Sequence, residues 1–410
     1  MIRFLTAGET HGPAEVAILE GIPAGLTLTH KDIQKELEKR RAGAGRGGRG
    51  KIEGDQVKIL SGIRHGKTLG SPIALLVENL DFPNWKEKMQ IEPLKSEGVN
   101  SIHLESVLAS HLGTITNPRP GHADLAGSLK YGFNDIRNVL ERASARETVM
   151  RVAVGAVCKK LLAEFDISIA SHTIQIGQIR LIRKPNNFQQ IASVYKTDPE
   201  IHCIDAKVSV KMKEEILSTT VKRDTLGGVI EIIANNVPAG LGSYVHYDRK
   251  LDGKIAQVLM SIPSVKAVEI GEGIINTEKY GSQVHDEIYY KPRSDLECVK
   301  GLTLGYFRKT NRAGGIEGGV SNGEDIVCRV YHKPLSTVGN ALTTVDIKTK
   351  QTARAVVERS DICVIPRAGV IAESMLAFVL ADAFLEKFGG DNLSEVKFNF
   401  QGYLSNLRNL

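Results

Sequence analysis

Leu19-Glu20-Gly21-Ile22-Pro23-Ala24-Gly25-Leu26 and Ala234-Asn235-Asn236-Val237-Pro238-Ala239-Gly240-Leu241 are two versions of one segment within this chain of 410 residues. Each version follows a run of β-branched apolar residues and precedes a charged amphipathic stretch. The alternative is a chance match, because a strand, a Pro-Ala-Gly turn and a helix form a common local solution. Agreement in element type and order favours an ancient duplication, with helices expected over 32–41 and 248–260.

The duplication places a boundary near the middle of the chain. Pro23 and Pro238 are 215 positions apart, so the pseudo-repeats are expected at residues 1–214 and 215–410. With 42% hydrophobic residues, a chain of this length can bury a large core. We therefore expect one large domain over residues 1–410, with a functional site where its two halves meet.

Strand-like and helix-like segments follow one another along the chain. Gly-rich turns such as Gly227-Gly228 precede several of the strands and favour antiparallel pairing, which gives an α+β fold class. The clearest helices are 147–165 and 370–388. The second is almost wholly apolar and ends at Gly389-Gly390, so it should be buried on most sides. The expected strands are 72–78, 201–210, 229–234, 325–332 and 396–400.

Composition narrows the class of protein. A net charge of +6 is mild for this size and indicates little about partners unless the charge is clustered. The cysteines have no Cys-x-x-Cys spacing, so we expect reduced packing residues, with neither a disulfide nor a metal site. The chain reaches Gly8-Glu9 too early for a signal peptide, and no run of eighteen uncharged apolar residues follows. These features predict a soluble, cytoplasmic protein with no membrane partner. The five cysteines are Cys158, Cys203, Cys298, Cys328 and Cys363.

Two segments in the first half carry residues that core packing does not require. Arg119-Pro120-Gly121-His122-Ala123-Asp124 sets a histidine and a carboxylate beside glycine and proline. Arg142-Ala143-Ser144-Ala145-Arg146-Glu147-Thr148 then opens a helix with hydroxyls and arginines. A general acid, hydrogen-bond donors, fixed charge and a positive helix end are what a buried anion needs. These segments therefore predict an anion site.

Gly8-Glu9-Thr10-His11-Gly12 is a second candidate for acid–base chemistry. Its glycines let the backbone approach a ligand, and a histidine titrates near neutrality. Such a segment is also typical of a turn with a surface histidine. Of the eleven histidines, only His11 and His122 lie in Gly-flanked loops near the ends of predicted strands or helices.

Positive charge clusters in the run Lys39-Arg40-Arg41-Ala42-Gly43-Ala44-Gly45-Arg46-Gly47-Gly48-Arg49-Gly50-Lys51. Cations this close together lie in solvent or surround an anion. An Arg/Gly-rich run is also typical of nucleic-acid-binding proteins, and this is the competing functional interpretation for residues 40–51. No aromatic residue is interleaved for base stacking, which favours small phosphates and carboxylates over nucleic acid. The glycines suggest a loop that closes over ligand.

Three further segments complete the set. Residues 314–324 contain five glycines, which free backbone N–H groups for a phosphate or for the edge of a flat ring. The segment lacks the Gly-Lys-Ser/Thr ending of a phosphate loop, so its spacing is unspecific. Residues 333–337 and 358–361 add a lysine, hydroxyls and an Arg/Asp pair, which are also common in surface turns.

Together, these motifs resemble the chorismate synthase family. The resemblance extends over nearly the whole chain, and six motifs in the family's order are very specific although each alone is weak. It implies a lyase of the shikimate pathway, which makes chorismate for aromatic amino acid biosynthesis by 1,4-anti elimination of phosphate from 5-enolpyruvylshikimate 3-phosphate. It also implies reduced FMN, required without net redox change. The hydrogen to be removed is unactivated, and reduced flavin can lend electron density as phosphate leaves and then take the hydrogen at N5.

The resemblance also implies a role for individual residues. His11 is the acid for the departing phosphate, and His122 protonates the reduced flavin. Asp361 and the hydroxyl of Thr10 relay the proton from N5. The arginines that hold the carboxylates and phosphates of substrate and FMN are Arg40, Arg46, Arg49, Arg119 and Arg359, the first two being assigned to NADP as well.

FMN contacts are expected from several separate segments. The chain departs from the family pattern at Thr10, where serine is usual, at Ser360, where histidine is usual, and at Pro263-Ser264, where an amide residue and alanine are common. The last departure puts two flavin contacts in doubt. The expected FMN-binding residues are Arg142, Ala143, Ser144, Pro263, Ser264, Gly318, Lys333, Pro334, Leu335, Ser336, Thr337 and Arg359.

The resemblance finally implies an architecture and an assembly. Family members share a β-α-β sandwich of antiparallel sheets around helices and form homotetramers, in agreement with the duplication and the buried helix. NADPH or a separate flavin reductase would reduce the flavin, and the sequence does not decide between them. The small-molecule substrate, and no nucleic acid, is the expected partner.

Overall fold

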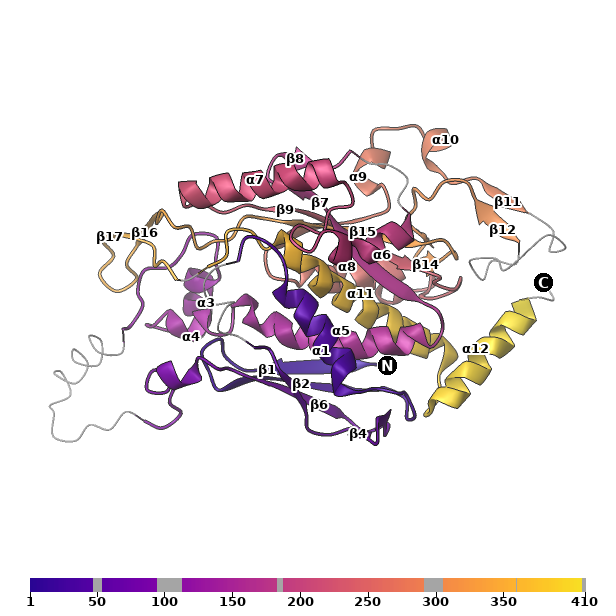
Figure 1. Cartoon of the computed structure of the whole chain (residues 1–410), viewed down its shortest axis with the longest axis horizontal. Coiled ribbons are helices and arrows are strands. Elements are labelled where there is room, and N and C mark those ends of the chain that lie inside the picture. Colours follow the sequence, from indigo (N-terminus) through magenta and orange to yellow (C-terminus); the bar gives the residue numbers. More distant parts are fainter. Residues whose placement is uncertain (47–53, 94–112, 183–186, 291–304, 359, 408–410) are drawn as a thin grey trace.

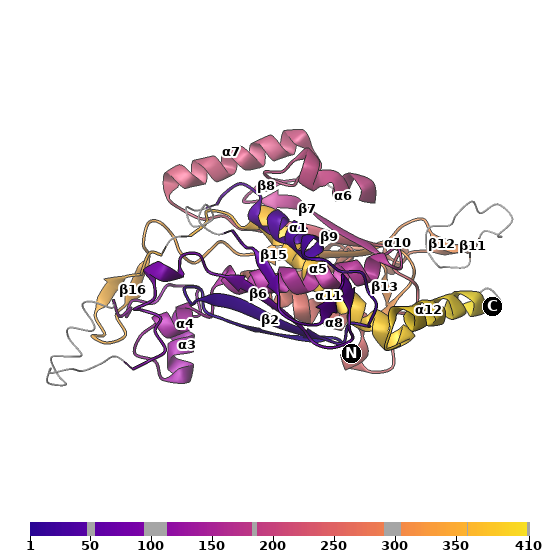
Figure 2. The same cartoon turned by 60° about the horizontal axis from the view of Figure 1, so that its bottom comes forward.

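The computed structural model describes residues 1–46, 54–93, 113–182, 187–290, 305–358 and 360–407 (Figure 1). Two antiparallel sheets and a layer of helices form most of the molecule. Figure 2 shows the layers from a second side, with α6 and α7 outermost, then the larger sheet, then the central helices and the smaller sheet. The α+β class and the antiparallel pairing expected from the sequence are confirmed.

The smaller sheet comes from the N-terminal part of the chain. Its strand order is β1-β2-β6-β3, and every pairing is antiparallel. Side chains alternate between the two faces, so Leu19 and Leu75 are buried on the inner face while Leu5 and Ile18 lie on the outer face. The strands are β1 (Arg3–Ala7), β2 (Ala14–Glu20), β3 (Val57–Ile59) and β6 (Ile73–Glu78).

The larger sheet has the order β10-β15-β9-β7-β8. Its central strand β9 is a run of β-branched residues that is buried along most of its length, because helices cover both faces of the sheet. The prediction of strands at 229–234 and 325–332 is confirmed by β9 and β15. The strands are β7 (Ser168–Ile176), β8 (Ile179–Arg180), β9 (Gly228–Asn235), β10 (Val265–Ile270) and β15 (Ile326–His332).

Two long helices lie between the sheets. α5 (Thr148–Ala163) packs against β2 and β6, and α11 (Ile365–Phe388) packs against β7, β9 and α5. The two helices cross closely: a Cβ added at Gly155 would lie 2.1 Å from the Cβ of Ser374. Both helices begin at the same end of the molecule, and this end holds the site described below.

α11 matches the predicted buried helix at 370–388, but it starts at Ile365, five residues earlier, because Pro366 is favoured in the first helical turn. By length and composition it could cross a membrane, and it is the one such helix in the part of the chain that the structure describes. However, 83% of its most apolar window is buried inside the fold. α11 is therefore the core helix of this domain.

The two Pro-Ala-Gly turns have the same hydrogen bonds. In the first turn, the hydroxyl of Thr68 donates to the carbonyl of Pro23 at 2.6 Å and accepts from Leu26 N–H at 2.9 Å. In the second turn, the hydroxyl of Ser321 donates to the carbonyl of Pro238 at 2.6 Å and accepts from the backbone N–H of Leu241 at 2.8 Å. The helices that follow are α1 (His30–Arg41) and α8 (Leu251–Met260), close to the predicted ranges.

Two of the predicted strands are wrong. Residues 201–210 form a turn and the start of α7 (Ala206–Lys222), because the Asp205 side chain accepts from the backbone N–H groups of Lys207 and Val208 and caps a helix. Residues 396–400 lie inside α12 (Leu393–Leu407), where Val396 and Phe400 are four residues apart and are buried on one helical face.

Four of the five cysteines are free and buried, as expected of packing residues, and Cys298 lies outside the described residues. The remaining helical elements are η2 (Phe82–Asn84), α3 (Asp124–Tyr131), α4 (Arg137–Leu140), η3 (Ala145–Glu147), α6 (Phe188–Thr197), η4 (Tyr247–Arg249), α9 (Gly273–Asn276) and α10 (Gly281–Val284). The remaining strands are β4 (Ile63–Arg64), β5 (Lys67–Thr68), β11 (Ile288–Tyr290), β12 (Tyr306–Arg308), β13 (Ile316–Glu317), β14 (Val320–Ser321), β16 (Thr343–Val345) and β17 (Thr352–Arg354).

Candidate active site

A cavity of about 850 Å³ lies at the first turns of α5 and α11. Its lining includes eight lysine or arginine side chains and four carboxylates, so positive charge is in excess. The positive ends of the two helix dipoles add to this excess. The cavity is therefore suited to an anion. The lysines and arginines are Arg40, Arg41, Arg46, Lys88, Arg119, Arg146, Lys333 and Arg367, and the carboxylates are Asp55, Asp81, Glu358 and Asp361.

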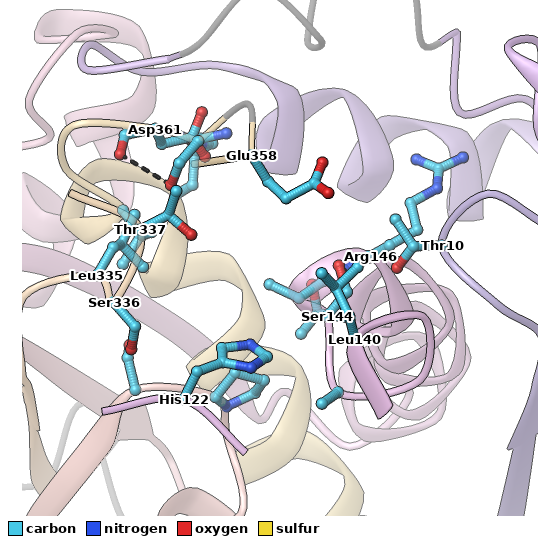
Figure 3. Close-up of a pocket in the computed structure, with 18 of the residues that line it drawn as sticks. Thr10, His122, Leu140, Ser144, Arg146, Leu335, Ser336, Thr337, Glu358 and Asp361 are labelled. Atoms are coloured by element: carbon cyan, nitrogen blue, oxygen red, sulfur yellow. Dashed lines mark hydrogen bonds and ion pairs between the residues drawn. The ribbon is translucent and has the colours of Figure 1, made fainter. Parts of the chain in front are cut away.

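Side chains from distant parts of the chain face one another across the cavity. Figure 3 shows Leu335, Ser336, Thr337 and Asp361 on one side, and Ser144, Arg146 and Thr10 on the other. His122 and Glu358 lie between these two groups in the same view. Residues from both predicted pseudo-repeats therefore meet at this site.

His11 is held in a buried position by one carboxylate and one ring. Its Nδ1 lies 2.8 Å from Glu141 Oε1, and its backbone N–H donates to Glu141 Oε2 at 2.8 Å. The imidazole stacks on Trp85 with ring centroids 3.6 Å apart. Burial alone would raise the pKa of Glu141, but the hydrogen bonds and charge of His11 outweigh it and hold this pKa below its ordinary value.

His122 also has a carboxylate partner, at the start of α3. Its Nδ1 lies 2.5 Å from Asp124 Oδ1, and Asp124 accepts hydrogen bonds from the Arg119 guanidinium as well. Burial opposes ionisation of Asp124, but the His122 and Arg119 hydrogen bonds and charges hold its pKa well below the ordinary range. Arg119 also donates to the hydroxyl of Thr337 at 2.9 Å. Arg119 thus links the His122 loop to residues 333–337, the segment that contains Thr337.

The start of α5 supplies hydroxyl and backbone groups. The hydroxyl of Ser144 caps the short helix η3 by accepting from the backbone N–H of Arg146, and the Thr148 hydroxyl donates to the carbonyl of Ala145 at 2.6 Å. Ala143 and Ser144, both expected to contact FMN, line the cavity. Capping thus keeps the positive end of this helix at the cavity wall.

Asp55 orients two arginines that face the cavity. It forms ion pairs with Arg40, at 3.0 Å, and with Arg146. Asp55 is buried, and these pairs outweigh burial to lower its pKa. Its backbone has φ +42°, a conformation that aspartate tolerates better than most residues. The sequence predicted Arg40 as a binding residue and placed Arg146 in the motif that predicts an anion site, but it missed Asp55.

The described part of the basic run is packed against the start of α11. The carbonyl of Gly45 accepts from the backbone N–H of Ile362 at 2.9 Å, and Gly45 has φ +79° where a Cβ would come within 2.9 Å of the carbonyl oxygen of Cys363. Burial and the neighbouring charge of Arg367 lower the pKa of Arg46, which lines the cavity. Residues 47–51 of the predicted closing loop, Arg49 among them, lie outside the described residues, as does Arg359.

The segment after β15 supplies the opposite wall. Lys333, Leu335, Ser336 and Thr337 line the cavity, and Lys333 Nζ donates to the hydroxyl of Ser336 at 2.8 Å. Burial, with the nearby charge of Lys266, lowers the pKa of Lys333. Pro334 does not line the cavity.

Pro263-Ser264, one of the departures from the family pattern, also lines the cavity. Ser264 has φ +70°, and its hydroxyl lies 2.9 Å from Nδ1 of His332. Burial lowers the pKa of His332 to about 4, so its imidazole is neutral at pH 7. The sequence offered no signal for His332 as a site residue, because it lies in an apolar strand rather than a Gly-flanked loop.

The two residues expected to relay a proton lie in the same cavity but on opposite sides of it (Figure 3). Asp361 forms an ion pair with Arg367, and the hydroxyl of Thr10 donates to the carbonyl of Glu141 at 2.9 Å. Ser360, where histidine is usual, lies beside Asp361 and also lines the cavity.

Besides Pro334, two further expected FMN contacts, Arg142 and Gly318, do not line the cavity. The Arg142 guanidinium donates to the carbonyls of Thr6 and Gly8, and it lies 3.8 Å from Glu15. Gly318 lies in the tight turn between β13 and β14. The structure therefore brings most of the predicted site residues together and leaves Arg142 and Gly318 apart from them.

Comparison with known proteins gives one consistent result. The family model described as "Chorismate synthase" matches residues 2–385. The chain is 49% identical over 410 residues to the chorismate synthase of Geotalea daltonii, and 47% identical over 408 residues to that of Alkaliphilus oremlandii, with full coverage of both chains in each case. It is also similar to a solved structure titled "Crystal Structure of Chorismate Synthase", with a TM-score of 0.76, 40% identity and coverage of 100% of this chain and 99% of that one.

These likenesses span the whole fold, and the cavity contains the histidines and arginines on which the sequence resemblance rested. The chain belongs to the chorismate synthase family, the lyases that form chorismate by eliminating phosphate from 5-enolpyruvylshikimate 3-phosphate.

Proposed function

We propose that the cavity holds the substrate together with reduced FMN, and that His11 and His122 each supply a proton there. One observation carries the proposal: two histidines, each with a carboxylate on Nδ1, line a single cationic cavity. A histidine held in this way can donate a proton from its other ring nitrogen.

The arginines are proposed to bind the substrate's anionic groups. Arg40 and Arg46 from the basic run and Arg119 from the His122 loop reach the cavity, so cations surround it from two separate segments, as carboxylates and a phosphate at different positions on one small molecule require. Arg49 and Arg359 are proposed to join them. Since Arg40 and Arg46 face this cavity, we propose that the basic run serves small anions rather than nucleic acid. Arg40 and Arg46 are also the proposed contacts for NADP.

The residues present fit FMN. Hydroxyls of Ser144, Ser336 and Thr337 and the amine of Lys333 could hold its phosphate and polar ring edge, and the apolar side chain of Leu335 could contact its ring. Reduced FMN, when bound, would supply electron density to the substrate and accept its unactivated hydrogen. Pro263 and Ser264 keep their proposed place, whereas Arg142 and Gly318 would need a different arrangement of the chain to contact FMN.

Each catalytic side chain has a specific proton to hold. His11 would donate to the departing phosphate, with Glu141 on its Nδ1, and His122 would hold a proton near the cofactor, with Asp124 on its Nδ1. Asp361 and Thr10 are proposed to relay the proton that leaves the substrate. Because they lie on opposite sides of the cavity, bound molecules or water would complete the path between them.

The outer face of the smaller sheet supports the proposed homotetramer. Leu5 and Ile18 are neighbours in the β1–β2 register, and their side chains are 76% and 48% exposed. Apolar residues this exposed on a sheet face are typical of an interface. We also propose that the enzyme is cytoplasmic and that NADPH or a flavin reductase supplies the reduced cofactor.

The packing of α5 and α11 between the two sheets supports the expected β-α-β sandwich. The matched hydrogen bonds of Thr68 and Ser321 support an internal duplication with pseudo-repeats 1–214 and 215–410 in one domain. We propose both on these grounds.

Stopped-flow absorbance under anaerobic conditions tests the cofactor proposal. Limiting photoreduced FMN should support many turnovers per flavin, because the reaction has no net redox change, and oxidised FMN should bind without reaction. Asp361→Asn should slow hydrogen removal more than phosphate departure. One product per flavin, or equal rates with oxidised FMN, would contradict the proposal.

A further inference from the structure

Trp85 is the one tryptophan in the chain, and it lies against His11. The two ring planes are inclined by 23° with centroids 3.6 Å apart. Trp85 follows the short helix η2, and its Nε1 donates to Asp81 Oδ2 at 3.1 Å. The indole is therefore fixed by its own hydrogen bond, and it covers one face of the imidazole.

Glu141 holds the same loop from another side. Besides its two contacts to His11, its backbone carbonyl accepts hydrogen bonds from the N–H and the hydroxyl of Thr10, both at 2.9 Å. Glu141 lies at the end of α4, 130 residues from His11 in the sequence. One residue thus fixes the backbone of the loop and the ring of its histidine.

Other charged groups act on this arrangement. Arg137 lies 3.1 Å from Glu141 Oε1 and 5.1 Å from the indole, and Glu358 lies 3.6 Å from Arg137. Lys88 Nζ lies 5.4 Å from the centre of the indole, and Asp81 accepts the hydrogen bond of the indole N–H. The two cations oppose a protonated His11 and the carboxylates favour it. Direct contact at 2.8 Å in a buried setting makes Glu141 the dominant influence.

We propose that Glu141 and Trp85 are positioning residues that fix the His11 imidazole, with Nδ1–H on the carboxylate, and so make Nε2 the nitrogen that transfers a proton. The carboxylate stabilises the imidazolium and holds Nδ1–H, while the indole face stabilises the cation and excludes water from one side. When Nε2–H gives its proton to the leaving phosphate, the ring becomes neutral and keeps Nδ1–H on Glu141. The inference rests on the proposed role of His11.

The stack also provides a readout that needs neither substrate nor cofactor. A protonated imidazole in contact with an indole quenches its fluorescence, so the emission of the full chain should rise as His11 loses its proton. In Glu141→Gln the midpoint of this pH titration should fall by about one to three pH units, the scale for losing an opposite charge at this distance. Glu141→Asp should restore part of the shift.

Matched variants separate positioning from general disturbance. His11→Gln should abolish the titration, and Glu20→Gln, at an exposed glutamate, should leave its midpoint unchanged. An unchanged midpoint in Glu141→Gln, or a titration that persists in His11→Gln, would overturn the inference. If the midpoint shifts as expected but kcat does not change, the positioning stands and the proposed role of His11 fails.

Turnover tests the part played by Trp85. Trp85→Phe should keep kcat within a few-fold of the wild type because an aromatic face remains, whereas Trp85→Leu should lower kcat about tenfold with little change in KM. Equal kcat values for the two variants would show that the aromatic face has no positioning role.

Discussion

The His11 pair and the His122 pair use the same contact in two different settings. Both rings direct Nδ1 at a carboxylate, at 2.8 Å and 2.5 Å respectively. The His11 side chain is 8% exposed, is stacked on an indole and has a partner 130 residues away. The His122 side chain is 19% exposed, and its partner is two residues away and is shared with Arg119.

The difference indicates how each histidine depends on the rest of the fold. The geometry of His11 requires β1, α4 and η2 to be in place, so it is a product of the whole N-terminal half. The geometry of His122 is made within one short loop and the first residue of α3. We expect the His11 pair to be sensitive to core packing and the His122 pair to local changes of charge.

The largest expected effects come from removing either histidine. His11→Asn and His122→Asn should each lower turnover by about two to four orders of magnitude, the usual scale of general acid–base catalysis. His11→Asn should give the larger loss of turnover. His11 is buried under an indole, so water can take its place less easily than it can take the place of His122, which is more open. Steady-state assays with excess reduced FMN measure kcat for each variant and for the wild type.

His65→Asn is the matched control for these histidine variants. His65 is exposed and has φ +49°, a conformation that asparagine also accepts, so this variant should keep its activity. Near-wild-type turnover in folded His11→Asn and His122→Asn proteins would show that neither residue donates a proton.

An intermediate effect is expected from Asp124→Asn, which removes the shared carboxylate of the His122 pair. Breaking a buried pair leaves the Arg119 charge uncompensated and should cost about 3–5 kcal/mol in the free energy of unfolding at pH 7. Because the pKa of Asp124 is lowered in the folded state, its stabilisation is fully present above the ordinary aspartate pKa of about 3.9 and is lost as the pH falls below it. The deficit of the variant should therefore shrink between pH 5 and pH 2 in urea titrations.

Asp205→Asn is the control for that change. Asparagine caps a helix as well as aspartate does, so α7 should keep its stability within about 0.5 kcal/mol. A deficit in Asp124→Asn that does not vary with pH would mean that the carboxylate is not ionised in the folded protein.

The smallest effect concerns Glu15, a carboxylate near the His11 loop without a close donor. It is buried, its Oε2 has no hydrogen-bond partner among the described residues, and burial raises its pKa to about 7. The folded protein therefore keeps a proton that the unfolded chain releases, and wild-type stability falls as the pH rises from about 4.5 to about 7. Glu15→Gln removes this loss, so its gain in stability should be about 2 kcal/mol larger at pH 8 than at pH 5.

Urea unfolding at the two pH values measures this difference. Glu20→Gln, at an exposed position on the same strand, should show little change with pH. If the difference in stability between Glu15→Gln and wild type were the same at pH 5 and pH 8, then Glu15 would be charged in the folded protein, like Glu141 and Asp124.

The same contrast explains how much of the site could be predicted from the sequence. Asp124 stands in the motif that contains His122, so the motif already contained the pair. Glu141 lies 130 residues from His11 and precedes a motif without being part of it, so only the fold brings the two together. Trp85 and Asp55 were missed for the same reason: each acts through a neighbour that is distant in the sequence.

The fold was predicted best where the pattern was long. The apolar run of α11 and the β-branched run of β9 exceed what a turn or surface segment allows, and both elements formed as expected. The short segments 201–210 and 396–400 fit either period, and the cap at Asp205 and the helical spacing of Val396 and Phe400 decided for helices. Short patterns that fit both periods are thus decided by further features, here a local helix cap and the burial of one helical face.

The close crossing of α5 and α11 at Gly155, inside the core, sets the width of the active site. The first residue of α5 lies about 10 Å along the helix from this crossing, and that of α11 about 13 Å from Ser374, so the crossing acts as a pivot for both cavity walls. A methyl group at residue 155 would wedge the helices apart and spread their positive ends. Core packing at Gly155 thus sets the distance between the two anion-binding helix ends. A variant at this remote glycine would therefore have the kinetics of an active-site mutant.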